Sequence, residues 1–555
     1  MSDARLDIAL SPFSEKDRQL AIWLGSAAAI LICLFGNLGA LGLVGPDEPR
    51  YVWIARAMAE TGDWVTPRLF GQPWFEKPIL YYWAAAVGFR MHLPAEWAAR
   101  LPSAFAALTA AFAIGWVARR FYRRDVNSLS SPILFAPLLF CTSIAAIGFS
   151  RSASPDMLFT ASITLAMASA AEVLRRGRAL RSLEESRQPD LVPLALFGLF
   201  LAAGVLAKGP AAVLLAGGAV FLWMIGTGKW RVAIRLAHPI SIVICLVVAL
   251  PWYVVCAWRN PDFLHVFIFQ HNFERYLTPM FQHRQPFWFF GPIVLLALLP
   301  WTVLLWPTLE EGVRLWREKV WRASPGFFFA CWAIFPVVFF SFSQSKLPGY
   351  VLPSIPPLAL ICSVAGVRAW DEARAGSRFV FAGIGATWLV IGIAGFAVMR
   401  SSRLAGSIPL AMGITAVVLG ALAGVTLVTL SFARKARVAI GLTILFVCAA
   451  VLFVNYAVLP AVDPMFSARA HAEFMRNDQH PDRIFTYQLA RSWNWELAFY
   501  FRRELPEWSP SDPEAALVLT TPAGLAELRK LGRFQGELEE PSPGITYVPV
   551  QREPR

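Results

Sequence analysis

The stretch AHPISIVICLVVALPWYVVCAW (237–258) decides the class of fold. It contains 22 residues with no acidic or basic side chain other than His238, and the polar residues Arg259 and Asn260 follow it. A helix of ~20 apolar residues crosses the ~30 Å hydrocarbon core of a bilayer. The stretch therefore predicts a transmembrane helix.

The rest of the chain repeats this pattern. Hydrophobic residues make up 57% of the 555 residues, and the mean hydropathy is +0.52, which indicates a polytopic membrane protein. The apolar runs predict thirteen spans and an all-α membrane domain. These spans cover residues 18–40, 98–118, 131–150, 157–174, 191–207, 210–227, 237–258, 287–307, 325–343, 350–367, 379–399, 405–432 and 438–460.

Basic residues alternate between the two sets of connections. The N-terminal tail and the even-numbered connections hold 25 Lys and Arg, the opposite loops hold 14, and the C-terminal segment holds 11. Positively charged loops stay in the cytoplasm, so the N-terminus is predicted to be cytoplasmic and the C-terminus external. Since the net charge of +13 is spread along the chain as topology signals, it does not indicate a nucleic-acid partner.

The same charge alternation decides between two interpretations of one apolar segment. The domain limits follow from a change in composition near residue 461. Counting 79–93 as a span would move every later basic loop to the wrong side, so it is predicted to be an interfacial or re-entrant helix within a long external loop, 43–97. Residues 1–460 form the predicted membrane domain. From 461 to 555, charge, proline and short apolar stretches such as LVLTT (517–521) and ITYVPV (545–550) predict a small soluble α/β domain.

Several kinds of site have no motif in this chain. The seven cysteines all fall within predicted spans without a CxxC pair, so neither disulfides nor a thiolate metal site is indicated. No HExxH motif is present, and no Gly-rich phosphate loop that would indicate a nucleotide. No internal repeat of the kind found in many transporters is evident.

The external loops carry acids and bases next to apolar spans. The residues concerned are Asp47 and Glu48 in GPDEPRY (45–51), Glu76 and Lys77 in FEKP (75–78), Arg151 and Asp156 in RSASPDM (151–157), Lys208 in LAKGP (206–210), Arg259, His265 and Arg275 in the fourth loop, and Lys346 and Tyr350 in SQSKLPGY (343–350). Charge at a membrane boundary is expensive unless it is hydrated or paired, so these residues indicate a polar cavity on the outer face. Cations of this kind suit a phosphate, and carboxylates suit the orientation or deprotonation of an acceptor.

Plainer interpretations compete with this one. Glu48, Arg50, Arg56 and Arg68 are predicted to face solvent or lipid headgroups. For the neighbours Glu76 and Lys77, and for Asp156, a structural ion pair is the alternative to a functional role. His265 lies in an aromatic stretch, where a headgroup-level or hydrogen-bonded histidine is commoner than a metal ligand.

Six strings together carry a family resemblance. PDEPRY, GDWVTPRLFGQPWFEKPILYYW, LAKGP, DFLHVF, PFWFF and KLPGYVLP occur in this order between residues 46 and 353. They resemble the GT-C membrane glycosyltransferases related to protein O-mannosyltransferases, and within them the bacterial 4-amino-4-deoxy-L-arabinose transferases that modify lipid A, a change associated with polymyxin resistance. The resemblance implies a GT-C fold, an undecaprenyl-phosphate sugar donor, a lipid A phosphate acceptor, membrane lipids as partners, and a multi-pass inner-membrane location with a periplasmic active site. We expect the protein to be a monomer.

The resemblance also assigns roles to residues. It implies that Asp47 is the principal catalytic acid, with Asp156 and Glu76 also in the catalytic site. A divalent metal ion, zinc or magnesium, would be shared by Glu76 and His265, and no nucleotide cofactor is expected. The implied substrate-binding residues are Lys77, Tyr82, Lys208, Arg259, Arg275, Lys346 and Tyr350.

Alternative functions remain open at this point. A GT-C transferase could instead move another polyprenyl-phosphate sugar to a hydroxyl of a glycan or protein. A flippase for lipid-linked sugars would share the spans and the polar cavity, and a lipid-binding scaffold would act through its C-terminal domain. Only an enzyme would turn over a polyprenyl-phosphate sugar.

Overall fold

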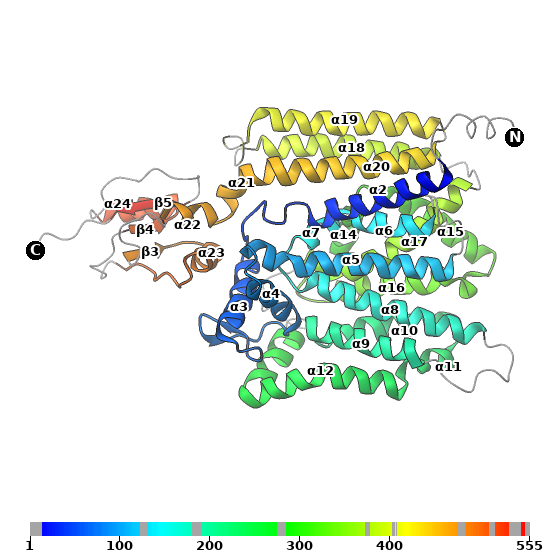
Figure 1. The fold of residues 1–555 in the computed structure, drawn as a ribbon, viewed down its shortest axis with the longest axis horizontal. Helices are drawn as coiled ribbons and strands as arrows, with labels where there is room; N and C mark the ends of the chain where they lie inside the picture. Colours follow the sequence, from blue (N-terminus) through cyan, green and yellow to red (C-terminus); the bar gives the residue numbers. More distant parts are fainter. Residues whose placement is uncertain are drawn as a thin grey trace, which may run out of the picture.

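The structure is a computed structural model of a helical bundle that carries a small mixed sheet at one end (Figure 1). It describes residues 14–122, 131–179, 191–274, 285–371, 378–401, 404, 406, 408–433, 435–475, 483–509, 517–531 and 545–549.

Nine helical stretches in the described residues are long and apolar enough to cross a membrane. Their exposed side chains are apolar: Phe112 is 70% exposed and Val425 64%. Such surfaces would be unstable in water and fit contact with lipid. The stretches are α2 (Glu15–Phe35), α5 (Ala95–Phe121), α8 (Asp156–Ala179), α9 (Leu191–Lys208), α11 (Trp230–Ala233) with η1 (Ile234–Ala237) and α12 (Pro239–Arg259), η6 (Pro348–Ser354) with α17 (Ile355–Asp371), α18 (Arg378–Met399), α19 (Leu410–Phe432), and α20 (Ala436–Phe453) with η7 (Val454–Val458) and α21 (Leu459–Phe466).

The remaining four predicted spans correspond to bent or short helices. Helices α10 (Ala211–Thr227) and α16 (Pro325–Ser341) have 17 residues each, the lower limit for crossing a bilayer. Helices α6 (Pro132–Cys141) and α7 (Ile144–Ser150) meet at 58°. The described residues thus contain nine long apolar helices, or eleven spans if each bent pair is counted as one, and α10 and α16 are two further, shorter apolar helices.

The second bent pair corrects the span predicted over 287–307. Helix η3 (Phe287–Phe289) with α14 (Phe290–Ala297) turns by 108° into η4 (Trp301–Leu304) with α15 (Leu305–Arg317). Pro300 lies at this break, and proline lacks the N–H that would continue the helix. After the break, Trp306 and Leu309 are more than 60% exposed on the same helix as Arg314 and Arg317, so α15 is amphipathic. The short helix η5 (Trp321–Ala323) precedes α16.

The predicted external loop 43–97 folds into short elements at one end of the bundle (Figure 1). They are α3 (Glu48–Thr61), the antiparallel strands β1 (Arg68–Leu69) and β2 (Gln72–Pro73), and α4 (Leu80–Arg90). Helix α4 has 11 residues and rises ~16 Å, too little to cross a bilayer. The prediction that 79–93 is not a span is therefore confirmed.

The C-terminal segment forms a three-stranded sheet in the order β3-β4-β5, with β3 and β4 parallel and β4 and β5 antiparallel. Both apolar stretches named from the sequence are strands, and every residue of β4 is buried. The elements are α22 (Arg469–Met475), β3 (Ile484–Tyr487), α23 (Arg491–Phe501), β4 (Leu517–Thr520), α24 (Pro522–Lys530) and β5 (Thr546–Pro549).

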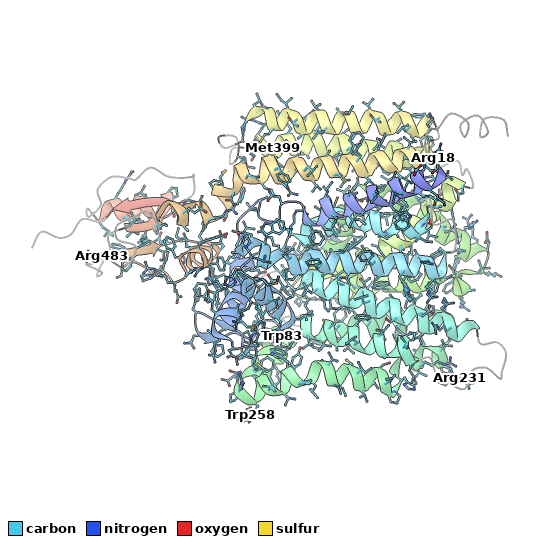
Figure 2. The ribbon with its side chains drawn as sticks, viewed as in Figure 1. Arg18, Trp83, Arg231, Trp258, Met399 and Arg483 are labelled. Atoms are coloured by element: carbon cyan, nitrogen blue, oxygen red, sulfur yellow. The ribbon has the colours of Figure 1, made fainter. Side chains whose placement is uncertain are left out.

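The two ends of the bundle differ in what they carry. Figure 2 shows Arg18 and Arg231 at one end, and Trp83, Trp258 and Met399 toward the other, beyond which lies Arg483 in the C-terminal segment. The first two belong to connections that the charge alternation assigns to the cytoplasm. The arrangement thus separates the predicted cytoplasmic end from the end that holds α3, α4 and the C-terminal sheet.

Candidate active site

Asp47 lies immediately before helix α3 with its carboxylate accessible. It occupies the N-cap position, yet its side chain makes no capping hydrogen bond, and that side chain is 55% exposed. Pro49 in the first helical turn favours the start of a helix here. One turn later, the guanidinium of Arg50 donates to the Asp47 carboxylate. The helix therefore presents an accessible carboxylate held by one cation.

Arg50 joins this carboxylate to the FEKP string. Its Nη1 lies 2.8 Å from Oε2 of Glu76, and Nζ of Lys77 lies 3.3 Å from Oε1 of the same carboxylate. Arg50 is buried, which opposes its charge, but Glu76 and then Asp47 attract that charge, and the pKa of Arg50 is raised overall. The predicted residues Asp47, Glu76 and Lys77 thus form one cluster, with Arg50 at its centre.

Arg50 was missed as a site residue, and the prediction of headgroup-facing charges was wrong for three of four residues. Glu48, Arg50 and Arg56 are at most 9% exposed, whereas the side chain of Arg68 is 40% exposed, as predicted. Glu48 pairs with Arg100 at 2.9 Å, and Arg56 donates to the Phe499 carbonyl at 3.0 Å. These partners are distant in sequence. For Arg50, the three-residue spacing from Asp47 was a usable helical signal.

Two buried tyrosines lie beside this cluster. Tyr82 and Tyr51 are almost fully buried, with ring centres 6.1 Å apart. Burial, and then the charge of Glu76, raises the pKa of both phenols, so both remain neutral. The Tyr82 hydroxyl has no hydrogen-bond partner among the described residues. A buried hydroxyl normally has one, so Tyr82 offers a group that a ligand or water could bind.

The second predicted acid forms a separate cluster. Asp156 begins α8, and Lys208 ends α9, and the Lys208 ammonium donates to the Asp156 carboxylate. The Ser154 hydroxyl donates to the other carboxylate oxygen at 3.0 Å. The Lys208 ammonium also lies 5.6 Å from the centre of the Tyr350 ring. Three predicted site residues from three loops therefore meet here.

Glu48 connects the two clusters. It follows Asp47 directly, and its Oε1 accepts a hydrogen bond from the backbone N–H of Ala153 at 2.7 Å. Ala153 belongs to the loop that contains Ser154 and ends at Asp156. The first external loop and the loop before α8 are therefore held together at the same end of the bundle.

The other predicted cations have different surroundings. Lys346 is 7% exposed, and its ammonium donates to the carbonyls of Ser343 at 2.7 Å and Gln285 at 3.0 Å. Arg259 is half exposed and lies 3.3 Å from Asp63. Arg275 lies outside the described residues. The structure thus brings neither Lys346 nor Arg259 into an ion pair with the two clusters.

The proposed metal ligands do not form a recognisable metal site. His265 is exposed in the π-helix η2 (His265–Glu274), with its ring 5.7 Å from that of Phe269. Both carboxylate oxygens of Glu76 already face cations, Arg50 and Lys77. Within the described residues, no group of three His, Cys, Asp or Glu side chains could hold an ion. We therefore assign no chemical step to a metal, and metal binding by Glu76 and His265 stays a prediction.

An apolar groove opens beside the second cluster. Its volume is about 430 Å³, and its walls are α7, α14 and η6, so both bent helix pairs contribute. Phe149 and Pro348 line it, and an added Cβ on the adjoining Gly349 would lie 3.0 Å from Phe149 and 3.2 Å from the Asp156 carboxylate. The groove therefore adjoins the Asp156 cluster through Gly349. The full lining is Ile144, Ala145, Gly148, Phe149, Ser152, Ile293, Leu296, Ala297, Pro348, Val351, Leu352 and Ile355.

Comparison with known proteins agrees with this fold. Over 344 residues the chain is 31% identical to the undecaprenyl phosphate-alpha-4-amino-4-deoxy-L-arabinose arabinosyl transferase of Edwardsiella ictaluri, a match covering 62% of this chain and 59% of the relative. The crystal structure of ArnT from Cupriavidus metallidurans bound to undecaprenyl phosphate matches with a TM-score of 0.75 at 22% identity, over 96% of this chain and 99% of that one. The archaeal oligosaccharyltransferase AglB from Archaeoglobus fulgidus matches with a TM-score of 0.52 at 11% identity, over 97% and 74% of the two chains.

The family comparison covers the part that contains most of the site. Residues 20–267 match the family described as dolichyl-phosphate-mannose-protein mannosyltransferase. This range includes Asp47, Glu76, Asp156 and Lys208. The structural matches confirm the predicted fold class, a GT-C membrane domain with a small C-terminal α/β part. The chain is therefore a multi-pass membrane protein of the GT-C fold, and its residues 20–267 match the dolichyl-phosphate-mannose-protein mannosyltransferase family.

Proposed function

We propose that this protein is an inverting glycosyltransferase that moves a sugar, 4-amino-4-deoxy-L-arabinose, from undecaprenyl phosphate to a phosphate of lipid A. The names of the arabinosyl transferase relatives support the sugar and the donor. The match to those relatives spans less than two thirds of their length. The proposed activity is therefore supported by the geometry of the site as well as by the names of the relatives.

One observation carries the proposal. Two clusters of paired carboxylates and ammonium or guanidinium groups, around Arg50 and around Lys208, lie at the same end of the bundle, and an apolar groove adjoins the second. A polyprenyl phosphate needs both environments, an apolar surface for its chain and cations for its phosphate. The groove is formed by membrane helices, so such a donor can enter from the bilayer.

The transfer would proceed by displacement at the anomeric carbon. An acceptor oxygen forms the new bond to C1 of the sugar while the bond from C1 to the donor phosphate oxygen breaks, and undecaprenyl phosphate leaves with that electron pair. Negative charge grows on the leaving phosphate during this step. Lys77 and Lys208, whose side chains are 19% and 16% exposed, are placed to stabilise it in a partly desolvated site.

Both lysines are now paired with carboxylates. Lys77 faces Glu76, and Lys208 contacts Asp156. Before the donor binds, these carboxylates neutralise the two lysines. A donor phosphate would then replace or share the contacts. Such exchange avoids isolated charges near the membrane boundary.

Asp47 has the accessible carboxylate that faces the acceptor in this proposal. A phosphate acceptor is already ionised near pH 7, so a general base would contribute little, and Asp47 would orient the acceptor or the sugar amino group. With a hydroxyl acceptor, Asp47 would instead take the proton. Asp156 is the second acid, held in place by Lys208 and Ser154.

We further propose that the chain lies in a bacterial inner membrane with α3, α4 and the C-terminal sheet in the periplasm. The basic connections support this orientation, as does the location of Arg18 and Arg231 at the opposite end of the bundle (Figure 2). In this orientation the donor and the lipid A acceptor would meet in the outer leaflet.

Purified protein in detergent, incubated with labelled undecaprenyl-phosphate aminoarabinose and lipid A, tests the function. We expect labelled lipid A and release of undecaprenyl phosphate, measured with and without EDTA because of the predicted metal ligands. Transfer to a glycan or peptide hydroxyl, with none to lipid A, would replace the acceptor. Movement of the donor across a vesicle membrane without turnover would identify a flippase and overturn the proposal.

A further inference from the structure

Helix α23 of the C-terminal segment contacts the polypeptide on both sides of Asp47. Figure 1 shows α23 next to α3. Before Asp47, the backbone N–H of Gly45 donates to Oε1 of Glu496 at 3.1 Å. After Asp47, the Arg50 guanidinium lies 4.8 Å from the centre of the Trp495 ring. Two neighbouring residues of one helix therefore hold the residues that flank the principal predicted acid.

The Glu496 carboxyl is buried and its hydrogen bonds are to backbone groups. It is 2% exposed, and its second oxygen accepts from the Ala468 N–H at 3.0 Å. It forms no ion pair with any described residue. An acidic side chain is costly in such a place, so a simple packing role would be better served by an apolar residue. The structural role of the Glu496 carboxyl is therefore to accept hydrogen bonds from these two backbone N–H groups.

Gly45 is the point at which this contact acts on the loop. Its φ angle of +72° lies in the left-handed region that glycine adopts without strain. The following residues turn directly into α3, with Asp47 only two positions away. Other residues of α23 extend the same contact: the Tyr500 hydroxyl accepts from the Leu43 N–H at 2.9 Å.

We propose that Glu496 is a positioning residue for sugar transfer, which holds Gly45 and thereby sets the direction of the Asp47 carboxylate, so that the C-terminal segment is part of the active site. This inference rests on the proposed function. Neither Glu496 nor α23 touches a reacting atom in it. Their effect is transmitted through the backbone of residues 43–47.

Substitutions at Glu496 test the proposal, with Glu504 as a matched control. Glu504 is an exposed residue of the same segment. Glu496→Gln keeps an acceptor for one N–H group, and Glu496→Ala keeps none. Since a misplacement of about 1 Å can reduce a rate about 10²-fold, we expect kcat to fall ~10²-fold in the alanine variant and less in the glutamine variant. The KM for the undecaprenyl-phosphate sugar should stay close to that of wild type, because the donor lysines are unchanged.

Hydrogen exchange of the 43–47 backbone provides a readout that does not require activity. We expect faster exchange in Glu496→Ala than in Glu504→Ala. If the alanine variant does not fold, the comparison of Glu496→Gln with Glu504→Gln at equal melting temperature decides. Equal kcat in that pair, or equal exchange in the folded variants, would overturn the inference. An inactive wild type with the expected exchange difference would instead overturn the proposed function and leave the link between Glu496 and this loop in place.

Discussion

The Glu48 carboxylate accepts a hydrogen bond from the Ala153 N–H at 2.7 Å, which joins the loop of Asp47 to the loop of Asp156. Glu48 also pairs with Arg100, whose guanidinium donates to the carbonyls of Leu38, Leu41 and Gly42. Adjacent carboxylates therefore have different tasks. Glu48 holds the two loops together, while Asp47 remains accessible to a substrate.

Glu48→Gln should lower stability. The amide cannot maintain the charged contact with Arg100, and loss of a hydrogen bond between charged groups costs about 1.5–3 kcal/mol. Thermal unfolding in detergent measures this, with Glu60→Gln, an exposed position of the same helix, as the control. Equal melting temperatures of the two variants would show that the Glu48 contacts contribute nothing.

Asp47→Asn should lower kcat by about 10²–10⁴, the range for a positioned acid or base, with folding intact because the amide is nearly isosteric. Steady-state turnover of the labelled donor measures it. The control is Asp262→Asn, because Asp262 is an exposed residue of the fourth external loop. If both variants turn over at the wild-type rate, Asp47 is a structural charge and the catalytic role must move to Asp156.

Lys77→Ala should weaken donor binding. It removes one charge-assisted contact to the phosphate, worth about 1.5–3 kcal/mol, or roughly a tenfold to a hundredfold rise in Kd. Binding of undecaprenyl phosphate to purified protein measures the change. Lys530→Ala, an exposed lysine of the C-terminal segment, should bind like wild type. A Kd for Lys77→Ala equal to that of the control would remove Lys77 from the donor site.

Stability should fall as pH rises from 7 to 9, in part because of Glu496. Burial raises the pKa of this carboxyl from 4.5 to about 9, so the folded protein binds a proton that the unfolded chain has lost. Its contribution is complete below pH 4.5 and is lost as pH rises toward 9. Burial lowers the pKa of His471 to about 4, so its contribution changes only below pH 6.5. Melting temperatures from pH 7 to 9 should therefore decline less in Glu496→Gln than in Glu504→Gln. Parallel declines would contradict this.

Cysteine labelling should show that the two ends of the bundle face different compartments. In a background without the seven native cysteines, a membrane-impermeant maleimide added to spheroplasts should label Glu504→Cys but not Glu318→Cys. Both positions are exposed. Permeabilised cells should label both, which controls for reactivity. Labelling of Glu318→Cys alone would reverse the topology and move the site to the cytoplasm.

The positions of the membrane helices could be predicted from the sequence because length and hydropathy are local properties. A run such as 237–258 is long and apolar enough to cross the bilayer whatever surrounds it, whereas α4 is too short to cross it. The bend after α14 was not predicted, since apolar residues continue on both sides of Pro300. Only the orientation of α15 relative to the bundle shows that the apolar run changes direction there.

The candidate site was partly visible in the sequence for a similar reason. The location of acids and bases at span ends identified Asp47, Glu76, Lys77, Asp156 and Lys208. An isolated charge at a membrane boundary is costly, so its presence there indicates a partner or a function. Which of two neighbouring charges becomes buried depends on partners that the chain brings from elsewhere. Arg100 and Ala153 decide it for Glu48, and Glu496 reaches Gly45 across 451 positions. Those pairings arise from tertiary packing, and no local pattern of residues could specify them.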